Sequence, residues 1–478
     1  MASENVNFAS YQKARKNHWD AIARKMDSWT GWSAAYHQRL EEVYRFWVAP
    51  GQRVLELGCG HGDLLAALHP SKGIGVDFSP EMIQRARMRH PDITFVEADC
   101  HQLPMIEGPF DAIILSDLVD DIWDVQEVFA QLSRLCHERT RILINSYSRV
   151  WELPLFIAGK LGLAKRKMPQ NWLTIDDVSD ILHLSEFEVV RSWYEILWPL
   201  RFPFIAKLCN KFLAKLWPFK LLDMANFILA RPRPGRLPAA PLVSVIVAAR
   251  NEAGNIAEIF RRTPDMGAGT ELVFVEGHSQ DDTYSVIEKE IAKHPERMSQ
   301  LHRQTGKGKG DAVRLGFARA KGDVLMILDA DMTVPPEDLP RFYNALVSGK
   351  GEFINGVRLV YPMEAEAMRF FNFLGNKFFS MAFSWLLGQP IKDTLCGTKV
   401  LWKNDYELIA ANRSYFGEFD PFGDYDLIFG AAKLGLKIVD LPVRYRARAY
   451  GSTNIQRWRH GLILLRMVAF AAKKIKFT

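Results

Sequence analysis

The amino-acid sequence predicts two doubly wound α/β domains joined by a short linker, and three observations support this prediction. Short apolar runs alternate with helical segments between residues 52 and 117, and the same alternation begins again at residue 242. Between the two halves, residues 231–241 contain four prolines and no apolar periodicity, which is typical of a semi-rigid linker. At 478 residues, 48% of them hydrophobic, the chain is long enough to bury two separate cores.

The charge balance and the cysteines exclude several classes of protein. The net charge of +6 is spread along the chain. We therefore expect no nucleic-acid partner, because a nucleic-acid-binding surface requires clustered lysine and arginine residues. The five cysteines are scattered and never form a C-x-x-C pair, which argues against disulfides or a zinc site and indicates a reducing compartment. The N-terminus lacks the regions of a signal peptide, and no run of about 18 residues is free of charge and proline. We therefore expect no membrane-spanning helix and a cytoplasmic location, either soluble or peripheral on the inner membrane face.

Residues 1–230 form the first predicted domain. Its first 45 or so residues are rich in charges and aromatics without strand alternation, so we expect one or two helices that cap the site. A further helix begins after Ser79, a good N-cap followed by Pro80, and runs to about residue 90. The predicted strands are residues 54–57, 73–77, 93–99, 110–117 and 224–230. Residues 151–217, rich in aromatics and prolines, are predicted to be an insertion.

A glycine-rich loop follows the first of these strands. Gly58, Gly60 and Gly62 remove side chains where a ligand must approach the backbone, at the start of a helix with unsatisfied N–H groups. Asp77 ends the next strand, where a carboxylate can accept hydrogen bonds from both hydroxyls of a ribose. The spacing Gly-x-Gly-x-Gly differs from the dinucleotide pattern Gly-x-Gly-x-x-Gly, so a nucleotide-like ligand is expected and a dehydrogenase is disfavoured.

In these motifs the first half resembles a class I S-adenosylmethionine-dependent methyltransferase, which has a Rossmann-like fold. The motifs that carry the resemblance are residues 56–62, Asp77, residues 98–104 and residues 110–114. The resemblance implies S-adenosylmethionine as cofactor, with the methionine part held at Glu56, Gly58, Gly60 and Gly62, the ribose at Asp77, and the adenine at Asp99 and the Cys100 backbone. Asp117 follows the fourth strand and is a candidate contact for the methyl acceptor, although acids there are equally typical of a solvated helix start.

Three later segments leave the question of membrane contact open. Residues 205–217 place apolar side chains on one helical face and Lys207, Lys211 and Lys215 on another. Such a helix either lies in a membrane interface or packs on the domain with a solvated lysine face. Residues 370–387 are predicted to be a buried or interfacial helix. The tail, residues 457–476, alternates aliphatic and basic residues, and it is either a lipid-attracting or a solvated helix.

The second predicted domain, residues 242–478, is organised around Asp329-Ala330-Asp331. Residues 324–328 are a predicted buried strand, and ligands bind at the carboxyl ends of strands in open α/β sheets. Carboxylates spaced i and i+2 on an extended chain share a face, so both can approach one hard divalent cation, although an acidic turn has the same pattern. The basic loop 306–311 lacks the Gly-Lys-Ser/Thr ending of a P-loop, which disfavours an ATPase.

The second half resembles a family 2 glycosyltransferase of the dolichyl-phosphate mannose synthase branch, which has a GT-A-type fold. The matching motifs are residues 249–252, 276–283, 308–312, 329–331, 393–399 and 448–451. The resemblance implies inverting transfer from a nucleotide-diphospho-sugar. It places Asn251, Glu252, Glu276 and Asp281 around the nucleoside, Lys309 and Asp311 near the base or phosphate, Asp329 and Asp331 at Mg²⁺ or Mn²⁺, and Arg448 at a phosphate. Glu276 replaces the family's usual Asp, and Asn454 replaces a Lys of relatives that use lipid phosphates.

The sequence leaves the acceptors of both reactions open. Asp424 or Asp426 is the predicted general base if the glycosyl acceptor is a hydroxyl, and helix N-terminal acids are the alternative. We expect a bifunctional enzyme that methylates and glycosylates in glycan or glycolipid biosynthesis, with a glycan, lipid-linked or small-molecule acceptor. The alternative is a glycosyltransferase acting on polyprenyl phosphate at the membrane, with the methyltransferase-like domain as a binding or regulatory module.

Overall fold

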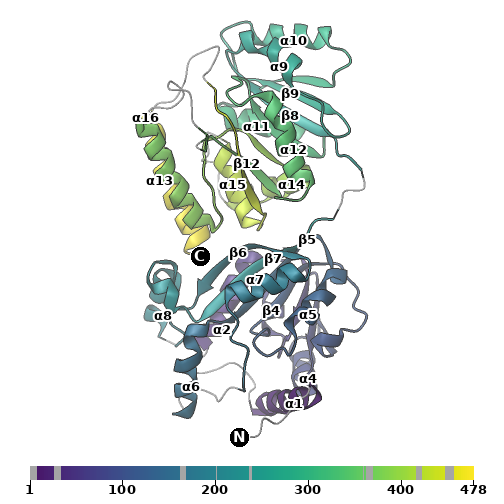
Figure 1. Cartoon of the computed structure of the whole chain (residues 1–478), viewed down its shortest axis with the longest axis vertical. Coiled ribbons are helices and arrows are strands. Elements are labelled where there is room, and N and C mark those ends of the chain that lie inside the picture. Colours follow the sequence, from purple (N-terminus) through teal and green to yellow (C-terminus); the bar gives the residue numbers. More distant parts are fainter. Residues whose placement is uncertain are drawn as a thin grey trace. The chain divides into compact units, whose positions relative to one another are not determined.

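The computed structural model divides the chain into two compact units, and each is described by itself (Figure 1). The structure describes residues 8–25, 34–161, 168–200, 202–235, 239–358, 360–361, 370–415, 423–446 and 457–478. Unit 1 comprises Met1–Arg233 with Phe477–Thr478, and unit 2 comprises Pro234–Lys476. The division falls inside the segment predicted as a linker, although the first two residues of that segment, Arg231 and Pro232, still belong to a strand.

Unit 1 is built on a seven-stranded sheet with the order β3-β2-β1-β4-β5-β7-β6. Its strands are β1 (Arg53–Leu57), β2 (Lys72–Asp77), β3 (Thr94–Glu97), β4 (Phe110–Ser116), β5 (Cys136–Tyr147), β6 (Phe187–Glu195) and β7 (Ala225–Pro232). All neighbours are parallel except that β7 runs antiparallel to both β5 and β6. The predicted parallel sheet is therefore mixed at one edge, while the α/β fold class is confirmed.

Some helices of unit 1 begin at residues whose side chains cap them. They are α1 (Phe8–Lys25), α2 (Ala34–Trp47), α3 (Asp63–Ala67), α4 (Pro80–Arg89), α5 (Val125–Leu132), α6 (Glu152–Lys160), α7 (Ile175–Leu184) and α8 (Pro203–Lys211). Ser79 caps α4 as predicted, because its Oγ accepts a hydrogen bond from Met82 N–H at 3.2 Å. Thr174 and Asp177 form a reciprocal capping box at the start of α7.

The segment 151–217 is only partly an insertion, which corrects the prediction from sequence. It contributes α7 and β6 to the domain, and β6 pairs with β7 along its length. Phe187 at the start of β6 is fully buried in the core of the unit. The predicted helix 205–217 is also shorter than expected, since α8 ends at Lys211 and is followed by a 3₁₀ turn, η4 (Leu213–Lys215).

Unit 2 is built on a second seven-stranded sheet, with the order β10-β9-β8-β11-β13-β12-β14. Its strands are β8 (Val243–Ala249), β9 (Thr270–Glu276), β10 (Ser299–Arg303), β11 (Val324–Asp329), β12 (Phe353–Val357), β13 (Lys399–Trp402) and β14 (Ile438–Pro442). Only β13 runs antiparallel to its neighbours. The helices are α9 (Ile256–Arg262), α10 (Thr283–Lys293), α11 (Lys309–Arg319), α12 (Leu339–Val347), α13 (Phe370–Leu387), α14 (Lys403–Ala411), α15 (Asp424–Lys433) and α16 (Arg457–Ala471).

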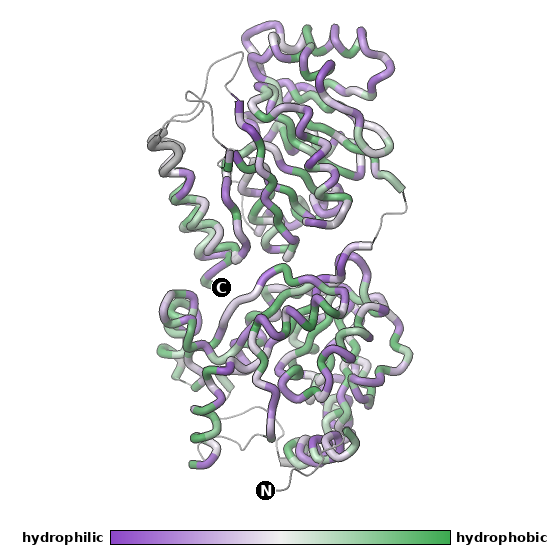
Figure 2. Tube along the Cα trace, in the orientation of Figure 1, coloured by the Kyte–Doolittle hydropathy of each residue, from purple (hydrophilic) through white to green (hydrophobic). Residues whose placement is uncertain are grey.

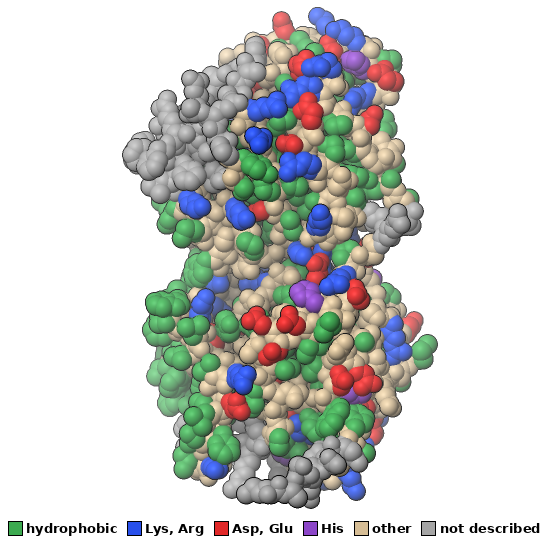
Figure 3. Space-filling model, in the orientation of Figure 1, with side chains coloured by type: hydrophobic (Ala, Val, Ile, Leu, Met, Phe, Trp, Pro, Cys, Tyr) green, Lys and Arg blue, Asp and Glu red, His purple; other side chains and the backbone are tan. Residues whose placement is uncertain are grey.

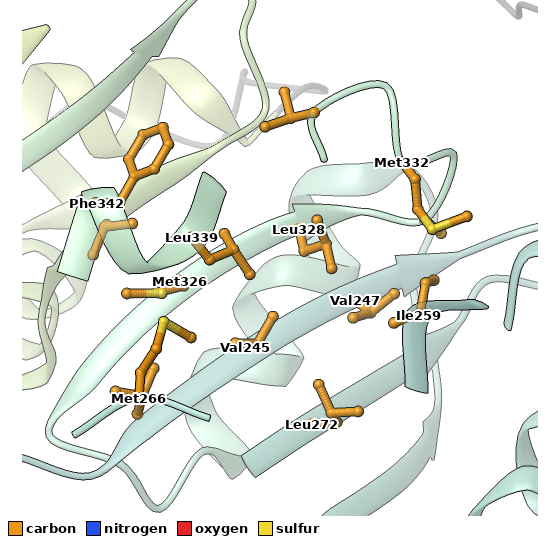
Figure 4. Close-up of a cluster of buried hydrophobic side chains, with 14 of the residues drawn as sticks. Val245, Val247, Ile259, Met266, Leu272, Met326, Leu328, Met332, Leu339 and Phe342 are labelled. Carbon is orange, nitrogen blue, oxygen red and sulfur yellow. The ribbon is translucent and has the colours of Figure 1, made fainter. Parts of the chain in front are cut away.

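The core of unit 2 holds the predicted site rigidly. Figure 4 shows Val245 of β8 and Met326 and Leu328 of β11 packed beneath Leu339 and Phe342 of α12, and all of these side chains are buried. The central strands of both units are coloured mostly as hydrophobic in Figure 2, as expected for strands covered on both faces. Polar residues at their carboxyl ends are therefore anchored by a close-packed interior. Within the described residues, no helix is both long enough and apolar enough to span a bilayer.

Candidate functional site

Unit 1 contains a cavity of about 830 Å³ at the carboxyl ends of its central strands. Six of the seven residues predicted to hold a cofactor line this cavity: Glu56, Gly58, Gly60, Asp77, Asp99 and Cys100. Side chains from α1 and α2 line it as well, among them Trp19 and His37, in agreement with the predicted helical cap. The sequence-distant motifs of the first half therefore meet at one enclosed site.

The three loop glycines have different reasons to be glycine. Gly58, Gly60 and Gly62 all have positive φ, at 70°, 52° and 76°. A side chain at Gly60 would meet no atom within 4 Å, so its backbone borders open space in the cavity. A Cβ at Gly62 would instead collide with the Phe95 ring, and Gly62 does not line the cavity. Gly62 thus serves the turn into α3, whereas Gly60 leaves room for a ligand at the backbone.

Two buried carboxylates flank this loop. Asp77 accepts hydrogen bonds from Gly60 N–H and Ser79 N–H, both at 2.9 Å, and burial raises the pKa of Asp77 to about 6. Glu56 is 2% exposed, and its Oε2 has no hydrogen-bond partner among the described residues. Burial also raises the pKa of Glu56 well above its usual range. An unsatisfied carboxylate oxygen facing a cavity fits a ligand that brings a cationic or hydrogen-bonding group, such as an amino-acid ammonium.

Asp99 caps a short 3₁₀ turn, η1 (Cys100–Gln102), at the cavity wall. Its Oδ1 accepts a hydrogen bond from His101 N–H at 2.8 Å and lies 2.6 Å from His101 Nδ1. Burial alone would raise the pKa of Asp99, but the hydrogen bonds from His101 lower it overall. The donor atoms of Asp99, Cys100 and His101 lie within 4.8 Å of one another, as in a metal site. Hydrogen bonds between Asp99 and His101 hold two of these three groups together, and burial raises the pKa of the Cys100 thiol.

Asp117 lines the same cavity. Its Oδ1 accepts hydrogen bonds from the Tyr36 hydroxyl at 2.7 Å and from Asn145 Nδ2 at 2.5 Å. Asp124, and not Asp117, caps α5, because Asp124 Oδ1 accepts from Glu127 N–H at 3.0 Å. The helix-start interpretation of Asp117 therefore does not apply, and Asp117 belongs to a polar cluster in the cavity. Tyr36 lies in the aromatic segment that was expected to cap the site, whereas no pattern in the sequence pointed to Asn145.

In unit 2, the predicted nucleoside-contacting residues come together where β8 and β9 end. Asn251 Oδ1 accepts a hydrogen bond from Gln280 N–H at 2.7 Å, and Glu276 Oε1 accepts one from Ser279 N–H at 2.5 Å. Glu252 is 8% exposed, and its N–H donates to Thr283 Oγ1 at 2.9 Å. The predicted residue Asp281 also accepts from Thr283 Oγ1, at 2.5 Å. These hydrogen bonds connect the loop after β8 with the loop after β9, and the two loops form one polar surface.

The basic loop 306–311 places the ammonium group of Lys309 beside Asp329. Lys309 Nζ lies 2.5 Å from Asp329 Oδ1. Burial would raise the pKa of Asp329, but Lys309 and then Lys399 and Arg358 outweigh burial and lower it. Asp311 does not face this pair; its Oδ2 accepts from Gln304 Nε2 at 3.0 Å and Gly306 N–H at 3.1 Å and so braces the loop.

The second carboxylate of the Asp-x-Asp pair is held by its own turn. Asp331 Oδ1 accepts hydrogen bonds from Thr333 N–H at 3.1 Å and Thr333 Oγ1 at 2.8 Å. Lys309 is paired with Asp329, so a metal ion bound to this carboxylate would have to compete with the ammonium. Carboxylate oxygens at a strand end are of the kind that Mg²⁺ or Mn²⁺ prefers.

A buried ion pair next to this site was missed from the sequence. Arg358 follows β12 and contacts fully buried Asp393 through Nε at 2.7 Å and Nη2 at 2.9 Å. Asn376 of α13 also donates to Asp393, at 3.1 Å. The rule that polar residues at strand ends line a site would have found Arg358, because it is the first residue after β12. Asp393 lay in a matched motif without an assigned role.

The remaining site predictions have different outcomes. Asp426 is 8% exposed and pairs with Arg413, whose Nε lies 2.7 Å from Asp426 Oδ2, and its role as a general base stays a prediction. Asp424 is the first residue of α15, and the preceding Gly423 packs against the backbone of Gly310 in the basic loop. Arg448 lies outside the described residues.

Comparison with protein families agrees with this geometry. Residues 54–139 match the family model described as methyltransferase domain, and residues 244–396 match glycosyl transferase family 2. Each unit thus contains a segment similar to one of two transferase families. The matched residues contain the glycine loop and Asp77 in one unit and Asp329 and Asp331 in the other. Unit 1 is hereafter the methyltransferase unit, and unit 2 the glycosyltransferase unit.

Relatives of 28–35% identity match part of this chain. A dolichol-phosphate mannosyltransferase of Pyrococcus furiosus is 30% identical over 220 residues, which are 45% of this chain and 59% of the relative. Two solved structures are more distant. Magnesium protoporphyrin IX methyltransferase from Synechocystis is 18% identical over 48% of this chain and 90% of its own, with a TM-score of 0.28. Glucosyl-3-phosphoglycerate synthase from Mycobacterium tuberculosis is 20% identical over 49% and 80%, with a TM-score of 0.36.

Proposed function

We propose that the protein is a bifunctional enzyme that transfers a methyl group from S-adenosylmethionine and a sugar from a nucleotide-diphospho-sugar. The family matches support a transferase in each unit. The observation that carries the proposal is that each unit gathers its own set of predicted polar residues at the carboxyl ends of its strands. The predicted residues of each set all lie within one unit, so we expect the two activities to be separable.

In the methyltransferase unit, the chain's own residues bind and orient. Glu56 would receive the ammonium of the methionine part, Gly60 would admit it to the backbone, and Asp77 would accept hydrogen bonds from the ribose hydroxyls. The cofactor would supply an electrophilic methyl group when bound. Asp117, held by Tyr36 and Asn145, would orient the acceptor in the same cavity, since in-line transfer depends mainly on positioning.

In the glycosyltransferase unit, Asp329 and Asp331 would hold Mg²⁺ or Mn²⁺, which neutralises charge on the leaving diphosphate when bound. Lys309 beside Asp329 and the nearby Lys399 and Arg358 make the surroundings favourable to that polyanion. The reaction is proposed to invert the configuration at the sugar. Asp424 would remove a proton from a hydroxyl acceptor, whereas an acceptor phosphate is already anionic and needs no base.

A polyprenyl phosphate is the second candidate acceptor, because the 30% identical relative is a dolichol-phosphate mannosyltransferase. The glycosyltransferase unit also exposes apolar side chains on α13 and α16, including Met381 at 68% and Leu462 at 63%. Lys476 lies near this surface, with Nζ 5.1 Å from the centroid of the Trp385 ring. Such helices would bring the unit to a lipid surface as a peripheral protein.

A donor screen tests the glycosyltransferase proposal. Release of nucleoside diphosphate is measured for a panel of nucleotide-sugars with Mn²⁺, with and without a polyprenyl phosphate. Asp331→Asn is expected to abolish release, and Asp338→Asn, which removes an exposed contact to Arg341, is the matched control. Undiminished release in Asp331→Asn would remove the proposed metal role.

We further propose that the two reactions serve one pathway that builds and methylates a glycan or glycolipid. Because the two domains are fused, the product of one domain is present at a raised local concentration at the other domain. Purified full chain given a nucleotide-sugar, an acceptor and methyl-labelled S-adenosylmethionine is expected to label the glycosylated product. Label that enters only an unrelated compound would refute the shared pathway. If S-adenosylmethionine does not bind at all, the first unit is instead a binding or regulatory module.

A further inference from the structure

The methyltransferase unit carries an apolar surface that neither proposed reaction uses. This surface, called the lipid face below, consists of residues 150–161, which include α6, and residues 202–222, which include α8, η4 and η5 (Phe219–Leu222). Five exposed large apolar side chains lie in the first segment and ten in the second. In Figure 3 green side chains gather at the left edge of this unit, over α6 and α8. Apolar exposure of this extent marks an interaction surface.

The two segments of the lipid face are held to one another and to the sheet. Trp151 Nε1 donates a hydrogen bond to Leu222 O at 2.8 Å, which links the α6 end to η5. Asn210 of α8 bonds the Trp198 backbone in both directions, with distances of 2.7 Å to the N–H and 2.8 Å to the carbonyl. These hydrogen bonds make the lipid face part of the fold of the unit, and its apolar residues do not belong to an unattached chain terminus.

The side of this segment that faces the protein is polar. Lys215, which the sequence placed on a solvated stripe, is 7% exposed and forms an ion pair with Glu195. Arg39 Nη2 lies 3.2 Å from the other oxygen of Glu195. Asp223 is fully buried beside this cluster, and burial raises its pKa to about 8. Polar groups thus anchor the segment inward, while its phenylalanine, leucine and tryptophan side chains point outward.

The most exposed of these side chains protrude. Phe204 is 91% exposed and Trp217 is 76% exposed. A protein partner would need a matching pocket for each protruding ring, whereas fluid acyl chains accept them without preformed complementarity. Aromatic side chains are also the residues that favour the boundary between hydrocarbon and headgroups. The geometry therefore favours a bilayer over a folded protein partner.

The charge of the lipid face agrees with an anionic surface. Residues 202–222 contain four lysines and no acidic residue, and residues 150–161 contain one acid, the exposed Glu152, and one lysine. One of these lysines, Lys215, is buried in the ion pair with Glu195. Lys207 is exposed, and Lys211 and Lys220 are partly exposed. Lys160 lies at the edge of α6, with Nζ 4.4 Å from the centroid of the Phe156 ring. Lysines placed around an apolar patch reach headgroup phosphates with their ammonium groups while their stems stay in contact with apolar surface.

We propose that the lipid face of the methyltransferase unit lies in the interface of an anionic lipid bilayer, with Phe204 and Trp217 inserted among the acyl chains. This contact is independent of the two proposed reactions and of any lipid contact by the glycosyltransferase unit. It would keep the methyltransferase cavity at a membrane surface, where a lipid-linked or amphiphilic methyl acceptor is concentrated.

Fluorescence quenching tests this contact at a single residue. Full chain is mixed with phosphatidylcholine–phosphatidylglycerol vesicles whose acyl chains carry bromine, which quenches tryptophan only at close range. Wild-type emission is expected to be quenched, and Trp217→Phe is expected to lose part of the quenched emission. Trp123→Phe removes another exposed tryptophan of the same unit, 45% exposed and outside the lipid face, and should leave the quenched part intact. Equal quenching in wild type and Trp217→Phe would overturn the proposal.

Vesicle flotation tests the same surface without relying on tryptophan. Phe204→Glu is expected to weaken binding to anionic vesicles at least about tenfold, since it replaces an inserted ring by a charge. Met105→Glu changes a side chain that is 95% exposed elsewhere on the unit, and it should bind like wild type. Unchanged flotation of Phe204→Glu would contradict the proposal. So would a wild-type dimer in vesicle-free buffer that Phe204→Glu converts to a monomer, because the face would then be a self-association surface.

Discussion

Asp77 gives the sharpest quantitative prediction, because its raised pKa ties ligand affinity to pH. With a pKa of about 6, roughly 97% of Asp77 is ionised at pH 7.5 and roughly 9% at pH 5. If the carboxylate accepts ribose hydroxyls, the Kd for S-adenosylhomocysteine should rise about tenfold between these pH values. An aspartate with the ordinary pKa of about 4 would remain mostly ionised at pH 5 and produce almost no change.

Loss of the fold does not explain such an effect. The folded-state pKa of Asp77 lies above the unfolded value, so ionisation of this group costs stability as the pH rises from about 4 to about 6. Protonation at pH 5 therefore favours the folded state while it weakens the ligand contact. On acidification, protonation of Asp77 should lower the affinity for S-adenosylhomocysteine and raise the stability of the folded state.

Isothermal titration calorimetry with S-adenosylhomocysteine at the two pH values provides the measurement. Asp77→Asn should bind weakly at both pH values and lose the part of the change that Asp77 causes. Because it retains Glu56, whose pKa is also raised, any pH dependence left in this variant reports Glu56. Glu97→Gln is the matched control, because Glu97 ends the neighbouring strand, pairs with Lys16 at 3.3 Å and does not line the cavity. A wild-type Kd that is the same at both pH values would refute the assigned role.

Three further substitutions test the fold and the second site. Gly62→Ala should destabilise the methyltransferase unit by about 1–3 kcal/mol in denaturant unfolding, because its φ of 76° and the neighbouring aromatic ring both oppose a Cβ; an unchanged midpoint would contradict this. Asp393→Asn leaves Arg358 buried without its counter-charge and should cost about 3–5 kcal/mol, lowering only the glycosyltransferase transition in calorimetry; a shift of both transitions would be unexpected. Lys309→Met should weaken nucleoside-diphosphate binding at least about tenfold, and unchanged binding would show that the ammonium beside Asp329 does not reach the phosphates.

The strand-end residues were accessible from the sequence because topology brings them together. Parallel strands expose their carboxyl ends at one edge, so Asp77 and Asp329 could be assigned to sites once their strands were recognised. The pairing of Arg358 with Asp393 was not accessible in the same way. It depends on how the chain after β12 returns to the sheet through the antiparallel strand β13, which no local pattern indicates.

Side chains that point inward to polar partners were the main source of error. Helical periodicity placed Lys215 on a solvated stripe, but Glu195 on β6 offers it a buried partner. Periodicity identifies two faces of a segment and cannot tell which is inward when the interior is charged. The pairing of Asp426 with Arg413 is likewise not visible in the sequence. Such ion pairs follow from tertiary packing and not from spacing along the chain.

The most direct test of the central claim is a crossed binding experiment on the full chain. S-adenosylhomocysteine, and separately uridine and guanosine diphosphates with Mn²⁺, are titrated into wild type, Asp77→Asn and Asp331→Asn by calorimetry. Two independent transferase sites predict that Asp77→Asn loses only S-adenosylhomocysteine binding and that Asp331→Asn loses only Mn²⁺-dependent nucleotide binding. Absence of S-adenosylhomocysteine binding to wild type, or loss of both ligands in either variant, would contradict the account.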